Sequence, residues 1–78
     1  MRYEIFSIKD CVAGTFGAFM LFNNTAVAER WFDSICRDSK DVAKDLQLFK
    51  LGYTNLETGD ITSCVTFVKS GVITDEQA

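Results

Sequence analysis

The feature that most constrains the fold is a pair of apolar-alternating segments separated by turn-forming residues. The segments span residues 47–53 and 61–69, and the linker between them contains Gly59. Two such segments around a glycine-containing linker are typical of a β-hairpin, in which Gly59 supplies the positive φ of the turn. Alternation predicts one inward, core-forming face on this hairpin, made by Phe49, Leu51, Tyr53, Ile61, Val65 and Phe67.

Ahead of the hairpin, a different periodicity predicts one main helix over residues 25–38. Asn23, Asn24 and Thr25 are residue types that cap helix N-termini. Apolar side chains then recur at helical spacing and form one stripe, made by Ala28, Trp31, Phe32 and Ile35. We expect this stripe to pack on the sheet that contains the hairpin.

Two further strands are predicted before the helix, over residues 2–9 and 19–22, with a loop over 10–17. In this loop Asp10 is expected to cap a turn and Phe16 to plug the core.

The first strand has large apolar side chains on both faces, because Ile5 lies on one face while Phe6 and Ile8 lie on the other. This pattern fits a central strand covered on both sides. It also fits a strand that contributes to a dimer interface or to a base-stacking surface.

Together these elements predict a single α+β domain over residues 1–70. Its sheet is antiparallel, has about four strands in the order β-β-α-β-β, and is covered on one face by the main helix. Residues 71–78 are expected to form a C-terminal tail, in which Val72 and Ile73 either add a short strand or dock on a neighbour.

Composition argues against an enzyme, a cofactor and a metal centre. The 78 residues include no histidine, the usual base for a Ser or Cys nucleophile. The three cysteines, Cys11, Cys36 and Cys64, are too few and too widely spaced for a structural zinc site or a disulfide framework. No segment resembles a secretory leader or a membrane span.

The size of the chain favours self-association. Scaling laws give roughly 8,000 Å² buried on folding, which contributes ~120 kcal/mol if about 60% is apolar. Ordering the chain at ~1.5 kcal/mol per residue costs nearly the same amount. An isolated monomer is therefore expected to be marginally stable, and a homodimer is one remedy.

Two classes of binding function fit the residues. The net charge of −3 disfavours broad, charge-driven binding of nucleic acid. Basic residues nevertheless occur on predicted strands or at their ends, and aromatic residues on the same strands are possible stacking platforms. The candidate nucleic-acid-binding residues are Arg2, Lys9, Lys50, Lys69 and Phe6. The alternative is a protein-interaction module that does not contact nucleic acid.

The order and spacing of several short motifs resemble one known family. The motifs are the opening residues 1–10, Ala13-Gly14, Phe16-Gly17, Asn24-Thr25-Ala26, Glu29-Arg30 with Phe32, the stretch 46–52, and Glu57-Thr58-Gly59. Over roughly residues 1–61 they are similar to the small nonstructural protein of gokushoviruses, single-stranded DNA phages of the Microviridae.

The resemblance implies a role in viral genome replication, through binding of single-stranded DNA in the host cytoplasm. It identifies no catalytic or binding residues. The alternative that we keep is a homodimeric adaptor that binds a phage or host replication protein without touching DNA.

Overall fold

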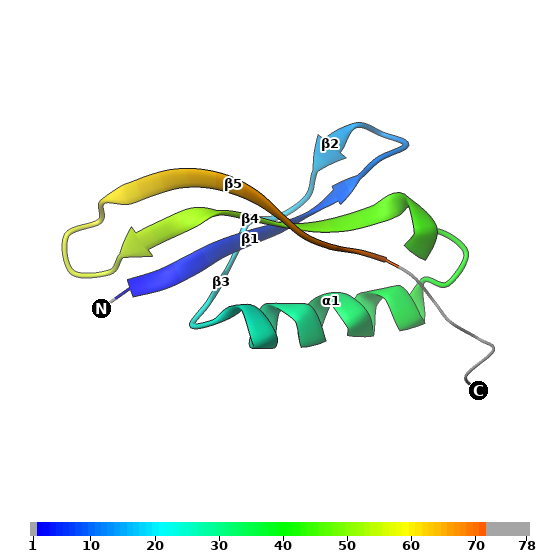
Figure 1. Cartoon of the computed structure of the whole chain (residues 1–78), viewed down its shortest axis with the longest axis horizontal. Coiled ribbons are helices and arrows are strands. Elements are labelled where there is room, and N and C mark those ends of the chain that lie inside the picture. The colour runs from blue at the N-terminus through cyan, green and yellow to red at the C-terminus, as the bar shows by residue number, and fades with distance from the viewer. Residues whose placement is uncertain (1, 72–78) are drawn as a thin grey trace.

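The computed structural model describes residues 2–71, which form an α+β unit with one main helix beneath a twisted antiparallel sheet (Figure 1). The elements in chain order are β1 (Arg2–Asp10), β2 (Thr15–Phe16), β3 (Met20–Phe22), α1 (Thr25–Asp38), a 3-10 turn η1 (Ala43–Asp45), β4 (Leu46–Asn55) and β5 (Ile61–Ser70). The α+β class and the antiparallel sheet are confirmed. The strand order is β-β-β-α-β-β and not the predicted β-β-α-β-β, because the loop after β1 contributes the short strand β2.

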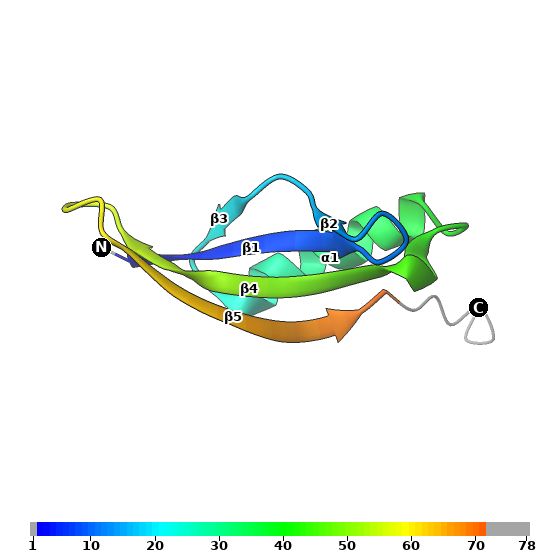
Figure 2. The same cartoon turned by 90° about the horizontal axis from the view of Figure 1, so that it is seen from above.

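The sheet has the order β2-β1-β4-β5, and β3 also pairs with β1. β2 pairs with the end of β1 at Lys9 and Asp10, whereas β3 pairs with it from Glu4 to Phe6. The long strands β1, β4 and β5 therefore form the sheet proper, and one edge of β1 is shared by two short strands. Figure 2 shows β5 at the opposite margin of the sheet.

The bounds of α1 agree with the prediction from local signals. Asn24 is the N-cap, and its Oδ1 accepts a hydrogen bond of 3.0 Å from the Val27 N–H. This bond satisfies one of the backbone donors that a helix leaves unpaired at its start. Ser39 follows as the C-cap, and its N–H donates to the Ile35 carbonyl at 3.0 Å.

The core lies between α1 and one face of the sheet. Phe6, Phe32 and Leu48 are fully buried there. The predicted helical stripe is present, with Ala28 and Phe32 buried and Trp31 and Ile35 packed against its margin. Cys36 extends the stripe by one turn.

The turn between β4 and β5 also follows the prediction. Gly59 has φ +80°, and Asn55 Oδ1 accepts from the Glu57 N–H at 2.8 Å. The Asn55 N–H donates to the Asp60 carbonyl at 3.0 Å and closes the hairpin.

The predicted facing of the hairpin is wrong. Leu51 is an extra residue in β4, because Ile5 pairs with Gly52 while Phe6 pairs with Lys50. This bulge breaks strict alternation along β4. Tyr53 pairs with Glu4 and Lys50 pairs with Phe6, so both side chains lie on the side of the sheet that faces α1.

The apolar residues expected to face inward on β5 lie instead on the side of the sheet away from α1. Ile61, Val65 and Phe67 are 71%, 62% and 50% exposed. Phe16 is wrongly predicted as a core plug, because its ring lies against Phe49 on this same side. We call this side the open face and define it by Ile5, Phe16, Phe19, Phe49, Leu51, Ile61, Ser63, Val65 and Phe67.

Candidate nucleic-acid interface

A row of three phenylalanine rings crosses the open face from β2 to β5. The ring centroids of Phe16 and Phe49 are 5.4 Å apart, and those of Phe49 and Phe67 are 5.7 Å apart. Both pairs meet edge to face, at interplanar angles of 75° and 73°. These are favourable geometries for aromatic pairs, so the row is held in place by its own contacts.

A hollow of about 400 Å³ lies beside this row on the open face. Its walls are almost entirely apolar and come from both ends of the chain, with lining residues Ile5, Phe16, Phe19, Leu51, Ile61, Ser63 and Val65. Phe19 is 66% exposed and projects from the segment between β2 and β3. Exposed apolar patches of this kind mark interaction sites on soluble proteins.

Two of the predicted basic residues lie at opposite ends of β1, each against an aromatic ring. Lys9 Nζ is 5.8 Å from the centroid of Phe16, at the start of the aromatic row. The Arg2 guanidinium stacks over Tyr53 at 3.8 Å from the ring centroid. Both contacts are within cation–π range. Of the two, Lys9 adjoins the open face.

The other two lysines lie on the side of α1 and are paired with carboxylates. Lys50 Nζ is 3.5 Å from Glu4 Oε2. Lys69 Nζ is 3.0 Å from Asp33 Oδ1 and 4.0 Å from Glu29 Oε1. Both lysines therefore neutralise acidic groups of the same chain, and the structure does not bring them together with Lys9.

Phe6 has no exposed surface, because it is enclosed between the sheet and α1. Its ring contacts Phe22 at a centroid distance of 6.0 Å. A base cannot stack on Phe6 in this fold. The rings that lie together on the open face are those of Phe16, Phe49 and Phe67, and the candidate set included none of them. The sequence did contain one indication of them: the predicted strands have more apolar faces than a single helix can cover.

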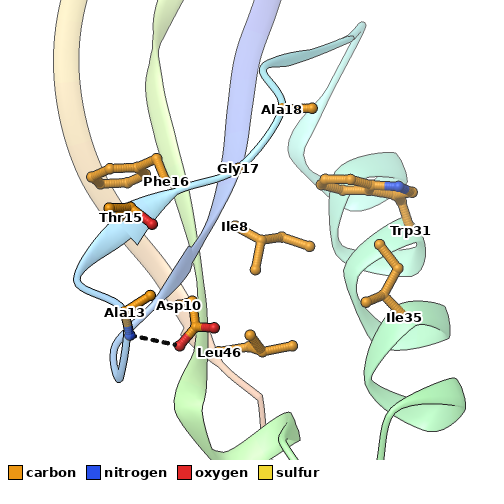
Figure 3. Close-up of a pocket in the computed structure, with 10 residues that line it drawn as sticks. All are labelled: Ile8, Asp10, Ala13, Thr15, Phe16, Gly17, Ala18, Trp31, Ile35 and Leu46. Carbon is orange, nitrogen blue, oxygen red and sulfur yellow. Dashed lines mark hydrogen bonds between the residues drawn. The ribbon is translucent and has the colours of Figure 1, made fainter.

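A second hollow, of about 350 Å³, lies between α1 and the loop after β1 (Figure 3). Trp31 and Ile35 line it from the helix, while Ile8 and Leu46 line it from the sheet. The remaining lining residues are Asp10, Ala13, Thr15, Phe16, Gly17 and Ala18. Figure 3 also shows the ring of Phe16 turned away from the helix, consistent with its contact to Phe49.

The one carboxylate that lines this second hollow, that of Asp10, accepts hydrogen bonds from backbone N–H groups of its own loop. Asp10 Oδ1 accepts from the Val12 N–H at 2.9 Å and from the Ala13 N–H at 3.2 Å. These bonds confirm the predicted capping role of Asp10. Apart from Asp10 and Thr15 the lining side chains are apolar, so the hollow is mainly an apolar surface.

Burial protects one of the three thiols. Cys36 is 2% exposed, and burial raises the pKa of its thiol, with the Asp33 carboxylate adding to the rise and Lys69 opposing it. Cys36 thus stays protonated at neutral pH and is a poor nucleophile. Across residues 2–71, the acidic, cysteine and histidine side chains form no cluster of three that could hold a metal ion.

This difference predicts a labelling pattern. A thiol reagent should modify the exposed Cys11 quickly in the native protein, and Cys36 only after denaturant is added. A time course followed by intact mass measures the number of modified thiols. Rapid labelling of all three under native conditions would contradict the packing of α1 on the sheet.

The comparisons with known proteins place the chain in a family. The family model described as phage ORF5 protein matches residues 3–74. The chain belongs to the phage ORF5 protein family. No curated protein and no solved structure matches it. The family assignment makes this a phage protein, and the matched range includes the lining of both hollows and the whole sheet except Arg2. Within the described residues, no helix is long and apolar enough to cross a membrane.

Proposed function

We propose that this phage protein, of the gokushovirus type, acts in viral genome replication by binding single-stranded DNA on its open face, without enzymatic activity, in the host cytoplasm. The observation that supports this most is the row of Phe16, Phe49 and Phe67 on the sheet face that lies away from α1. Base–aromatic stacking contributes about 1–3 kcal/mol per base and tolerates any sequence, because every base has a π-face.

The geometry of the row suggests how bases would lie. Phe49 is the middle ring and is only partly exposed, whereas Phe16 and Phe67 are 38% and 50% exposed. The two outer rings would therefore receive bases, and Phe49 would support both of them. The apolar hollow beside the row would accept the edge of an unstacked base or its sugar.

The electrostatics of the open face favour modest affinity. None of the nine residues that define it is charged, and Lys9 is the candidate lysine that adjoins it. For single strands the slope of log K against log salt is about −0.7 per phosphate contact. Few contacts therefore give a shallow slope, and stacking supplies most of the binding free energy.

The proposal predicts that substitutions on the open face of β5 weaken DNA binding, whereas substitutions on its other face do not. Fluorescence anisotropy of a labelled oligothymidine should show binding at low salt, and Phe67→Ala should weaken it about 5- to 150-fold, the factor that corresponds to the loss of one stacked base. Thr66→Ala is the matched control, because Thr66 pairs with Lys50 on the other side of the same strand. Equal effects of the two substitutions would contradict the proposed platform.

Salt dependence gives a second readout in the same assay. Lys9→Gln should reduce the slope by about 0.7, whereas Lys50→Gln should leave it unchanged because Lys50 already pairs with Glu4. If the wild-type protein binds no oligonucleotide even at low salt, the DNA proposal is wrong.

One observation favours a second candidate, a homodimeric adaptor that binds a phage or host replication protein. The hollow at Trp31 and Ile35 is mainly apolar, shares only Phe16 with the aromatic row, and has the size to receive one large side chain. Under this alternative, Trp31→Ala would abolish capture of the partner protein, and Phe67→Ala would not.

A further inference from the structure

One edge of the sheet is paired with short strands, and the other edge is open. The outer edge of β1 is occupied by β2 and β3. The gap between these strands is closed by the Gly17 N–H, which donates to the Ile8 carbonyl at 2.9 Å, and by Ser7 Oγ, which donates to the Gly17 carbonyl at 3.1 Å. The outer edge of β5 has no neighbouring strand among residues 2–71, as Figure 2 shows.

β5 lacks proline and central charges, two of the features with which proteins usually protect an edge strand, although its ladder with β4 is irregular between Ser63 and Thr66 and between Phe67 and Lys69. It is 10 residues long and contains no proline. Residues 61–68 are uncharged, and the charge that follows, Lys69, is turned toward Asp33 of the helix. A long, uncharged edge with unpaired backbone donors and acceptors is a template for pairing with another chain.

We infer that β5 pairs antiparallel with β5 of a second copy of this chain, so that two sheets become one. A two-fold axis perpendicular to the sheet makes this contact isologous, with the same strand on both sides. The uncharged centre of β5 meets itself without repulsion of like charges. The same axis keeps both open faces on one side of the joined sheet and both helices on the other.

A second copy fits this edge better than an unrelated peptide because of the side chains that would meet. Cross-strand partners in an antiparallel pair share a face. A register centred on Cys64 places Ser63 beside Val65, and Phe67 beside Ile61, of the partner copy. These residues lie on the open face, so pairing would cover part of their exposed apolar surface.

Cys64 is a suitable position at which to test this pairing. It is exposed, and its side chain contacts Thr66 Oγ1 on the side away from the open face. In registers centred on Ser63, Cys64 or Val65, the two copies of Cys64 are directly opposite or diagonal, within about 4.5–8 Å. Like charges at this position would therefore repel across the two-fold axis.

A charge-swap experiment follows. By sedimentation at micromolar concentration, the wild-type protein should have a mass near twice 8.7 kDa. Cys64→Lys and Cys64→Glu should each sediment as monomers, and an equimolar mixture of the two should recover the dimer mass. Circular dichroism of each variant checks that the monomer remains folded.

The control separates edge pairing from contact between open faces. Phe16→Glu places a charge on the open face at the opposite margin of the sheet, and the dimer should survive it. The inference is overturned by a monomeric wild-type protein, by dimers that persist in both Cys64 variants, or by dissociation of Phe16→Glu. The experiment contains no DNA, so its result is independent of the proposed DNA binding.

Discussion

Gly52→Ala is expected to cost about 2–6 kcal/mol of folding free energy, the sum of backbone strain and overpacking. Gly52 has φ +148°, a conformation that L-residues rarely adopt, and a Cβ there would overlap the Thr62 carbonyl oxygen of β5. Because the obstacle is backbone and not a flexible side chain, neither strand can move away without breaking the ladder. Small domains have a free energy of unfolding of about 5–15 kcal/mol, so the variant should lose a large share of its stability.

Gly59→Ala is the matched control for Gly52→Ala. Gly59 also has positive φ, +80°, but nothing lies within 4 Å of the position that its Cβ would occupy. Only the left-handed backbone is penalised, at about 1–2 kcal/mol. Urea denaturation followed by circular dichroism measures both losses. Similar losses for the two variants would show that the close approach of β4 and β5 at Gly52 is not as described.

Phe32→Ala is expected to cost about 3–5 kcal/mol, the usual range for removing a fully buried ring. Phe32 is 0% exposed in the centre of the core. Phe67→Ala removes the same side chain from the open face, where it is 50% exposed in the single chain, and should cost about 1 kcal/mol. Both are best measured in a Cys64→Lys background, so that association of β5 does not contribute.

The fluorescence of Trp31, which packs against the same core, reports unfolding in both phenylalanine variants. A large loss for Phe67→Ala in the monomer would mean that a part of the chain covers the open face. The contrast matters for function, because a residue that contributes little to monomer stability is free to serve in binding.

Local features of the fold could be predicted because their causes are local. The bounds of α1 follow from an N-cap residue and an apolar stripe, and the hairpin turn follows from Gly59 and its neighbours. Each signal involves residues only a few positions apart. The short strand β2 was missed because two residues are too few to show alternation.

The sequence did not indicate how the candidate binding residues are arranged. Lys9 lies beside the Phe16 ring, whereas Lys50 and Lys69 are paired with Glu4 and Asp33. Those carboxylates lie far from the lysines in the sequence, so no spacing rule indicates the pairs. Phe6 was assigned to a surface because both faces of β1 are apolar, and alternation does not say which face the helix covers.

By itself, the sequence determined the main helix and the long strands, because periodicity and capping depend on neighbours along the chain. It also determined that the strands have more apolar faces than one helix can cover. The tertiary structure alone decided which face became core. The bulge at Leu51 and the seating of α1 on Phe6 and Leu48 turn Phe67 and its neighbours outward. These are long-range contacts, whose free energy depends on packing across the sheet and not on the order of residues within one strand.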